Sequence, residues 1–583
     1  MNKTCKIVCS CFLLLVLSLA LGCGAMETRV PVSQEAIRVA KVESTADGIQ
    51  RAYQDYAFAC LAMIDGNYQE AEAYIREALQ EDPDSPYLLL KLSQVMAEDG
   101  RPEEALSSAQ RSVDLAPEDL AARSFLAELY SKLQQFGPAA AQYREILKQD
   151  PDNSDARLQL ATGFLRSKQY GAALKELSIL TEREPGLIIA HYYKGKINLE
   201  LKNYDEAEGS FLKVLELNAR FLPALFDLAA TYAAMGSTDR AIGTYRRILH
   251  LFPTDTAAWE RLIALYYQRG EVQLAEKAMD EMKAALGSGD VKRKRLGLIY
   301  LRYGKLKESI AELTSIVSAW PDDHEARYYL GAALEENGDL GEAYRNFELL
   351  SSESDYFINA RIHMAYILEK QEKIDEATDL LRDTIGQRAD KPPQLFLVLA
   401  SLHEMREEYQ SAMDVLEEGL GYNGESTELH YRLGVIFGKL KQTEKSIRQM
   451  EVVINIDPRH ADALNYIGYT YAEENRHLDK AQELIEKAIK YKPNSGYIID
   501  SLGWVYFRKG LYDKALTELK KAVELAPDDP AIVEHLGDVY LKKGSYGKAL
   551  EAYEKAISLK NAETERLERK IEDAKEHLKG VMP

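Results

Sequence analysis

The dominant pattern along the chain is a pair of amphipathic helices that recurs at a fixed interval. Apolar residues return three, four and seven positions apart, as in Leu516, Leu519 and Val523. This spacing places them on one face of an α-helix. A glycine often separates the two helices, and a proline, which cannot continue a helix, often follows the second. The pattern therefore predicts helix–turn–helix units and an all-α fold.

These units repeat on a 34-residue grid, and fifteen of them fit between Ala52 and Glu563. One extra residue is needed at Pro392 and another within 475–480. Place 8 of the unit is small except in the seventh, which has Ile263, and place 20 is alanine except for Ser309 and Ser446. Because one hairpin cannot bury its apolar face alone, the units are expected to stack into a solenoid.

The small residues at places 8 and 20, the turn glycine and the closing proline resemble the tetratricopeptide repeat. The resemblance covers about nine-tenths of the chain. It implies a right-handed superhelical α-solenoid in which the inner helices line a concave groove. In that family, places 2, 5, 9 and 12 of the repeat face the ligand.

Residues 564–583 are predicted to form a C-terminal capping helix, because Leu567, Ile571, Ala574 and Leu578 share one stripe. Irregular sequence at 285–290, 351–357 and 386–393 suggests joints within the array. The predicted segments are a signal peptide at 1–22, a lipidated N-terminus and tether at 23–51, units one to seven at 52–289, units eight to ten at 290–391, units eleven to fifteen at 392–563, and the cap.

The N-terminus has the three parts of a secretory signal: positive charge at Lys3 and Lys6, an apolar stretch too short for a membrane span, and small Gly22. The sequence Ala20-Leu21-Gly22-Cys23 also resembles the lipobox of bacterial lipoproteins. That resemblance implies cleavage before Cys23, acylation of Cys23 and attachment to the membrane. Gly24 in place of aspartate implies the periplasmic face of the outer membrane. A plain secretory signal and an uncleaved anchor are the alternatives.

The remaining cysteines do not predict a disulfide framework. Cys5, Cys9 and Cys11 lie in the signal segment, so only Cys23 and Cys60 would remain after cleavage. Cys60 lies in a helical pattern beside small and apolar residues, where a buried small side chain is the simplest interpretation.

Charge and motif content argue against several function classes. Acidic residues outnumber basic ones 93 to 73, for a formal net charge of −20, whereas nucleic-acid binding needs a basic face. No metal-ligand spacing or nucleotide-binding loop is present, and "LGSGD" at 286–290 lacks a Walker lysine. We therefore expect no enzyme activity, no cofactor, no metal and no small-molecule substrate.

Aromatic residues at the groove places are the candidate partner-binding residues, because tyrosine and tryptophan combine apolar area with a polar tip. The alternative is that many of them pack between neighbouring inner helices. No unit has the lysine and asparagine at places 5 and 9 that a carboxylate clamp needs. The candidates are Tyr192, Phe226, Tyr267, Tyr328, Tyr366, Tyr431, Tyr469, Tyr497, Trp504 and Phe507.

The functional expectation is a non-catalytic scaffold of the bacterial cell envelope that binds protein partners in its groove. The chain is similar to tetratricopeptide lipoproteins that assist outer-membrane assembly, pilus secretin assembly or exopolysaccharide export. A carbohydrate- or peptidoglycan-binding module is the alternative, since aromatic platforms also stack on sugars.

Overall fold

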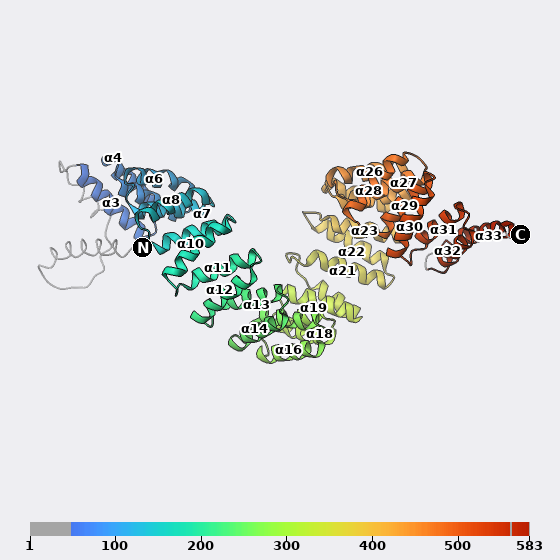
Figure 1. The fold of residues 1–583 in the computed structure, drawn as a ribbon, viewed down its shortest axis with the longest axis horizontal. Coiled ribbons are helices and arrows are strands. Elements are labelled where there is room, and N and C mark those ends of the chain that lie inside the picture. The colour runs from blue at the N-terminus through green and yellow to red at the C-terminus, as the bar shows by residue number, and fades with distance from the viewer. Residues whose placement is uncertain (1–47, 560–562, 582–583) are drawn as a thin grey trace. The chain divides into compact units, whose positions relative to one another are not determined.

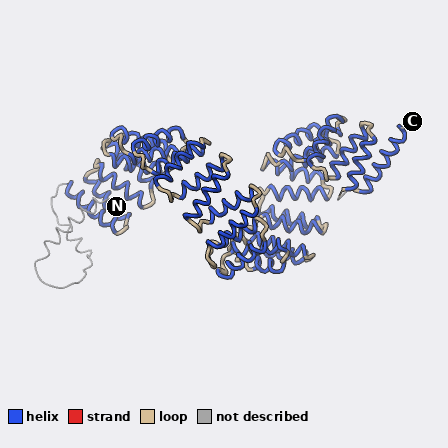
Figure 2. The backbone as a smooth tube through the Cα atoms, turned by 60° about the horizontal axis from the view of Figure 1, so that its bottom comes forward, coloured by secondary structure: helices blue, strands red, loops and turns tan. Residues whose placement is uncertain are grey.

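The computed structural model describes residues 48–559 and 563–581, and it shows 31 helices and no strand within them (Figures 1 and 2). The all-α prediction is therefore confirmed. The chain forms two compact units, one through Phe252 and the other from Pro253.

The first unit consists of six hairpins, each with a first helix and a second helix. Its first helices are α3 (Gly48–Ile64), α5 (Pro86–Glu98), α7 (Leu120–Lys132), α9 (Ser154–Arg166), α11 (Ile188–Glu200) and α13 (Leu222–Ala234). Its second helices are α4 (Tyr68–Glu81), α6 (Pro102–Leu115), α8 (Phe136–Gln149), α10 (Tyr170–Arg183), α12 (Tyr204–Leu217) and α14 (Thr238–Leu251).

The second unit consists of nine hairpins and a final helix, α33 (Thr564–Val581). Its first helices are α15 (Thr256–Gln268), α17 (Arg293–Arg302), α19 (His324–Asn337), α21 (Phe357–Lys370), α23 (Pro393–Met405), α25 (Thr427–Lys439), α27 (Ala461–Glu473), α29 (Gly496–Arg508) and α31 (Pro530–Lys542). Its second helices are α16 (Val272–Ala285), α18 (Leu306–Ala319), α20 (Leu340–Glu348), α22 (Ile374–Gln387), α24 (Tyr409–Tyr422), α26 (Thr443–Ile456), α28 (Leu478–Tyr491), α30 (Tyr512–Leu525) and α32 (Tyr546–Ser558). The described helices thus form the fifteen hairpins that the 34-residue grid predicts.

The small residue at place 8 lets the two helices of a hairpin pack closely. A Cβ atom added to Gly331 of α19 would lie 2.7 Å from the Phe347 ring of α20, well inside van der Waals contact. Gly503 of α29 meets Leu519 of α30 in the same way, at 2.6 Å. A side chain from the second helix therefore occupies the space that the missing side chain leaves.

The tight turn inside each hairpin needs a left-handed backbone conformation. Gly338, after α19, has a φ of +91°. Lys168 and Lys441 take φ values of +58° and +57° at the equivalent turns of their hairpins. L-residues enter this region at a cost of roughly 1–2 kcal/mol, so the turn geometry is imposed by the packing of the two helices.

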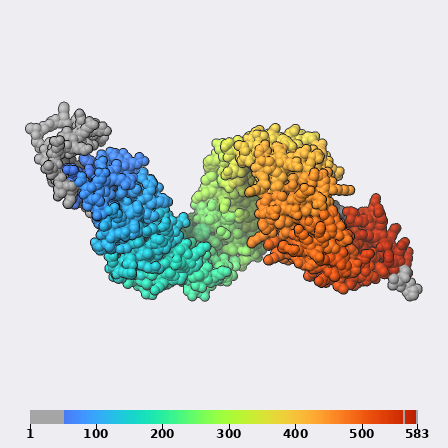
Figure 3. All heavy atoms as spheres, turned by 90° about the horizontal axis from the view of Figure 1, so that it is seen from above, coloured from blue at the N-terminus to red at the C-terminus, as the bar shows by residue number. Residues whose placement is uncertain are grey.

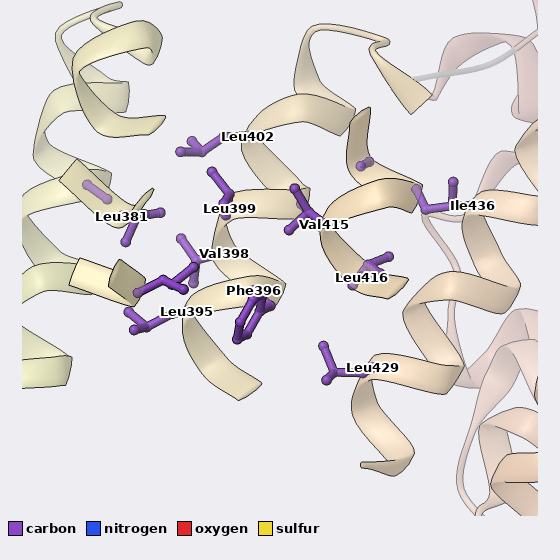
Figure 4. Close-up of a cluster of buried hydrophobic side chains, with 14 of the residues drawn as sticks. Leu381, Leu395, Phe396, Val398, Leu399, Leu402, Val415, Leu416, Leu429 and Ile436 are labelled. Atoms are coloured by element: carbon purple, nitrogen blue, oxygen red, sulfur yellow. The ribbon is translucent and has the colours of Figure 1, made fainter. Parts of the chain in front are cut away.

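Each first helix is buried between its own partner and neighbouring hairpins. Leu395 and Leu399 of α23 are fully buried in a cluster with Leu381 of α22 and with Val415 and Leu416 of α24 (Figure 4). The same cluster continues into α25 through Leu429 and Ile436. The core therefore continues from one hairpin to the next in this part of the chain. Figure 3 shows the chain with all of its heavy atoms.

The three irregular sequence stretches coincide with departures from the regular hairpin. Residues 286–292 lie between α16 and the shortened α17, residues 349–356 follow the nine-residue α20, and residues 388–392 precede α23. The division at Phe252 and Pro253 lies elsewhere, inside the range predicted as units one to seven. Flexibility at the three stretches and the predicted segment boundaries stay predictions.

Helix α33 covers the apolar face of the last hairpin. Leu567 and Ala574 are fully buried against Tyr553 and Ala556 of α32, and Ile571 packs on the same cluster. Leu578 is half-buried. The apolar stripe predicted for the capping helix is therefore the face of α33 that contacts α32.

A buried histidine–aspartate pair links α29 to α31. Nδ1 of His535 lies 2.9 Å from an oxygen of Asp500, and both residues are less than a tenth exposed. Burial lowers the pKa of His535, but Asp500, followed by Asp538 and Glu473, outweighs it and raises the pKa above its usual range. The raised pKa favours the protonated imidazole and therefore an ionic contact with Asp500.

None of the described helices is both long enough and apolar enough to cross a membrane. The predicted signal segment and Cys23 lie outside the described residues.

A first prediction concerns the close contact at place 8. Gly331→Ala should destabilise the protein by about 2 kcal/mol, because the added methyl group collides with the Phe347 ring. Gly209→Ala is the matched control, since nothing lies within 4 Å of its added Cβ in α12, and it should stabilise by up to about 1 kcal/mol. Thermal unfolding followed by circular dichroism measures both. Equal melting shifts for the two variants would contradict the packing argument.

A second prediction concerns pH. Because the pKa of folded His535 is raised above its unfolded value of about 6.5, the stability that the pair contributes is fully present below pH 6.5 and is lost as pH rises through the raised pKa. Asp500→Asn should therefore cost about 3 kcal/mol at pH 6 and less at pH 9.

Hydrogen exchange of peptides from α29 and α31 reports this contribution locally, with peptides from α19 as the internal control. A cost of Asp500→Asn that is the same at pH 6 and pH 9 would contradict the ionic pairing.

Candidate functional site

Three successive first helices of the second unit enclose a surface pocket of about 340 Å³. Its lining comes from α21, α23 and α25, with the residue that precedes α27 at one edge. The residues that line this pocket, called here the α23 pocket, are Tyr366, Leu397, Val398, Ser401, Glu428, Tyr431, Arg432 and His460.

Two of the predicted aromatic residues, Tyr366 and Tyr431, line the α23 pocket. Tyr366 of α21 is 38% exposed, and Tyr431 of α25 is half-buried with its ring centre 5.3 Å from that of His460. Leu397 and Val398, which also line the pocket, belong to α23, the first helix that comes between α21 and α25 in the chain. The lining thus combines aromatic and aliphatic side chains, which suits the apolar part of a ligand.

His460 is held as the cap of the next helix. Its Nδ1 accepts a hydrogen bond from the backbone N–H of Ala463 at 3.2 Å. Because Nδ1 is the acceptor, a neutral ring carries its proton on Nε2. His460 lies outside places 2, 5, 9 and 12 of its repeat, so the repeat pattern does not identify it.

The charged residues at the pocket differ in whether they are already paired. Arg432 forms an ion pair with Glu404 of α23, and Lys439 binds the same carboxylate at 2.6 Å. Glu428 is exposed, and its carboxylate accepts a hydrogen bond from the Ser426 hydroxyl at 3.1 Å. Its own backbone N–H, followed by the Thr427 and Ser426 hydroxyls, lowers the pKa of Glu428, so it is anionic at neutral pH.

The pairing at Glu404 belongs to a recurrent arrangement that we call the acid clamp. In it, one carboxylate on a first helix binds two basic side chains, seven residues apart, on the next first helix. Glu260 binds Arg295 and Arg302, at 3.0 and 2.7 Å. Glu335 of α19 binds His363 and Lys370 of α21, at 2.8 and 3.1 Å.

The acid clamps are well defined because their carboxylates are largely buried. The side chains of Glu404 and Glu335 are 10% and 13% exposed. Burial raises the pKa of Glu260, but Arg302 and Arg295 outweigh it and lower the pKa overall. The clamps therefore hold alternate pairs of first helices in register, including the two helices that carry Leu397 and Tyr431.

The predicted aromatics of the first unit pack against neighbouring aromatic rings. The ring of Tyr192 lies 5.2 Å from that of Phe221 and 6.2 Å from that of Phe211. The ring of Phe226 lies 6.1 Å from that of Tyr245.

In the second unit, Tyr267 and Tyr328 lie in similar packing. Tyr267 stacks on Tyr303 with ring centres 3.8 Å apart. Tyr328 stacks on Tyr356 at 5.0 Å, and its hydroxyl lies 3.2 Å from Nε2 of His363.

The C-terminal aromatics divide into a buried and an exposed group. Trp504 is 9% exposed, donates to Glu473 at 2.5 Å and stacks between Phe507 and His535, with ring centres 4.8 and 4.2 Å away. Tyr469 is half-buried. Tyr497 is 43% exposed, and its hydroxyl donates to Asp462 and accepts from Lys492 at 2.7 Å.

The structure thus brings only Tyr366 and Tyr431, among the ten predicted residues, into one described pocket. A second surface pocket, of about 530 Å³, is lined by the consecutive residues from Tyr491 to Tyr497. Partner binding by any of the ten stays a prediction. Among the described residues, no group of three or more His, Cys, Asp or Glu side chains is placed to hold a metal ion.

Comparisons with known proteins identify the repeat. Models described as "Tetratricopeptide repeat" match residues 62–129, 126–186, 158–220, 222–265, 294–345, 427–460, 461–495 and 532–563. A model described as "TPR repeat" matches residues 503–544.

Relatives and a solved structure show similarity of varying extent. A TPR repeat-containing protein of Pseudomonas aeruginosa is 30% identical over 32% of this chain and 31% of its own length. Cellulose synthase operon protein C of Pseudomonas fluorescens is 24% identical over 74% of this chain and 33% of its own length. The chain spans about a third of the length of these relatives.

Yeast Tom70 is 14% identical to this chain, with a TM-score of 0.36, over 73% of this chain and 96% of its own. The matched models cover parts of both units and agree with the hairpins that the structure shows. The chain therefore contains tetratricopeptide repeats in both of its units.

Proposed function

We propose that this protein is a non-catalytic adaptor of the bacterial cell envelope that binds partner proteins on its first helices. The observation that carries the proposal is the α23 pocket, which presents Tyr366 and Tyr431 to solvent on three neighbouring first helices. Repeat solenoids offer such extended surfaces for protein recognition, and exposed tyrosines contribute strongly to protein interfaces.

The envelope location rests on the sequence alone. Ala20-Leu21-Gly22-Cys23 resembles a lipobox, and Gly24 favours the outer membrane. Diacylglycerol on the Cys23 sulfur and a further acyl chain on its amino group would attach the chain stably, because anchoring needs more than one acyl chain.

Among the three processes considered from the sequence, exopolysaccharide export has additional support. One relative is named cellulose synthase operon protein C. In this proposal the chain would bring together proteins of an export assembly and would not itself act on the polysaccharide.

Direct sugar binding is less well supported than protein binding. An aromatic platform for a sugar needs an accessible ring face. Trp504, the tryptophan among the groove candidates, is 9% exposed and stacked between Phe507 and His535. The α23 pocket instead has a mixed aliphatic and aromatic lining.

A third prediction tests partner binding. A photo-crosslinking residue placed at Ser401, in the α23 pocket, should capture a discrete partner protein in cells. The matched control is Glu417, which is exposed on α24 and does not line this pocket. Adding Tyr366→Ala should reduce capture at Ser401 about 30-fold, as expected for loss of about 2 kcal/mol at an interface hot spot. Identical crosslinking patterns at Ser401 and Glu417 would refute the proposal.

A fourth prediction tests attachment. Cys23→Ser should move the protein from the membrane fraction to the soluble periplasmic fraction, and globomycin should cause the unprocessed form to accumulate. Cys60→Ala is the control, because Cys60 is buried in α3, and it should leave the protein in the membrane fraction. Membrane retention of Cys23→Ser would rule out the lipid anchor.

A further inference from the structure

One carboxylate, Glu428, lines the α23 pocket, and a second, Glu369, lies on α21, the helix that contributes Tyr366. Glu428 lies one turn before Tyr431 on α25, and Glu369 lies one turn after Tyr366 on α21. Residues three apart in a helix share a face. Each of the two tyrosines is therefore accompanied by a carboxylate.

Neither of these carboxylates is neutralised by the protein. Among the described residues, Glu369 and Glu428 form no ion pair. The nearby cations are bound to the acid clamps: Arg432 and Lys439 to Glu404, and Lys370 to Glu335. Arg432 lines the pocket, and its ion-pair partner there is Glu404.

The surrounding groove places have the same sign of charge. From α19 to α27, places 2, 5, 9 and 12 include no lysine or arginine. They carry six carboxylates: Glu325, Glu335, Glu369, Glu404, Glu428 and Asp462. Four of these form ion pairs, Glu325 with Lys294, Glu335 with Lys370, Glu404 with Arg432 and Lys439, and Asp462 with Lys492. Glu369 and Glu428 are the two whose negative charge is left to attract a ligand of the opposite charge.

The aromatic and aliphatic side chains of the lining add a second requirement. Tyrosine faces attract ammonium and guanidinium groups, while Leu397 and Val398 suit an aliphatic chain. Lysine and arginine side chains combine both features, with an apolar stem and a cationic head.

We propose that the α23 pocket binds a lysine or arginine side chain of an extended, basic segment of the partner, with the stem against Leu397 and Val398, the head beside Tyr366 and Tyr431, and Glu369 and Glu428 as counter-charges. This inference rests on the proposed function, because it specifies the partner of the same site. It excludes partners that present an acidic tail or an anionic polysaccharide to this pocket.

Fluorescence anisotropy with a labelled ten-residue peptide, in which arginine alternates with alanine and leucine, tests this preference on the full chain. The same peptide with glutamate at the arginine positions is the matched probe. We expect the basic peptide to bind at least tenfold more tightly than the acidic one, with an affinity that falls as salt rises. Equal binding of the two peptides would overturn the proposal.

Variants separate the pocket from the general negative charge of the protein. Glu369→Gln and Glu428→Gln should each weaken binding of the basic peptide about threefold, and together about tenfold, because they remove rim charges without removing volume. Glu417→Gln, on the exposed face of α24, should leave the affinity unchanged. An equal loss in Glu417→Gln would show general electrostatic attraction and would overturn the assignment to the pocket.

The two proposals fail in different ways. If Ser401 crosslinks a partner and the basic peptide does not bind, protein binding stands and the basic specificity falls. If the peptide binds with the expected variant effects and Ser401 captures no partner in cells, the specificity of the pocket stands and the adaptor function falls.

Discussion

Close packing of the two helices within each hairpin is the constraint on which the rest of this structure depends. Gly331 and Gly503 leave room for Phe347 and Leu519 of the following helix, and that approach forces left-handed turns at residues such as Lys168. The hairpin then presents one continuous apolar face to the next hairpin, as the Leu395 and Leu399 cluster shows. No hairpin buries that face alone, so the hairpins must stack. The exposed surface is then formed by side chains from several neighbouring hairpins.

The stack also explains why charge on the first helices is organised in pairs. A carboxylate such as Glu404 is too buried to remain without a counter-charge, and the next helix supplies two cations from one face. These acid clamps bind Arg295, Arg302, Lys370, Arg432 and Lys439. Glu369 and Glu428, which no clamp includes, remain available beside Tyr366 and Tyr431. The ion pairs that hold the helices together thus leave these two carboxylates without a counter-charge.

Much of the fold follows from local spacing, whereas little of the site does. The 3.6-residue periodicity, the small residue at place 8 and the stripe of Leu567 and Ala574 predict the hairpins and the capping helix because they concern neighbours in sequence. Places 2, 5, 9 and 12 of the repeat identify ten aromatic residues. Position in the repeat cannot distinguish Tyr366, which is exposed, from Trp504, which is stacked against His535. That difference depends on side chains about 31 residues away. For the same reason, the Asp500–His535 pair and His460 were not anticipated.

Hydroxyl-radical footprinting in intact cells, compared with the purified protein, tests most directly the claim that the first helices around α23 are the binding surface. Tyr366, in the pocket, and Tyr422, which is 59% exposed at the end of α24, are oxidised by the same chemistry. We predict that Tyr366 is oxidised several-fold more slowly in cells than in the purified protein, while the relative rate at Tyr422 is unchanged. Equal oxidation of Tyr366 in both settings would contradict the account.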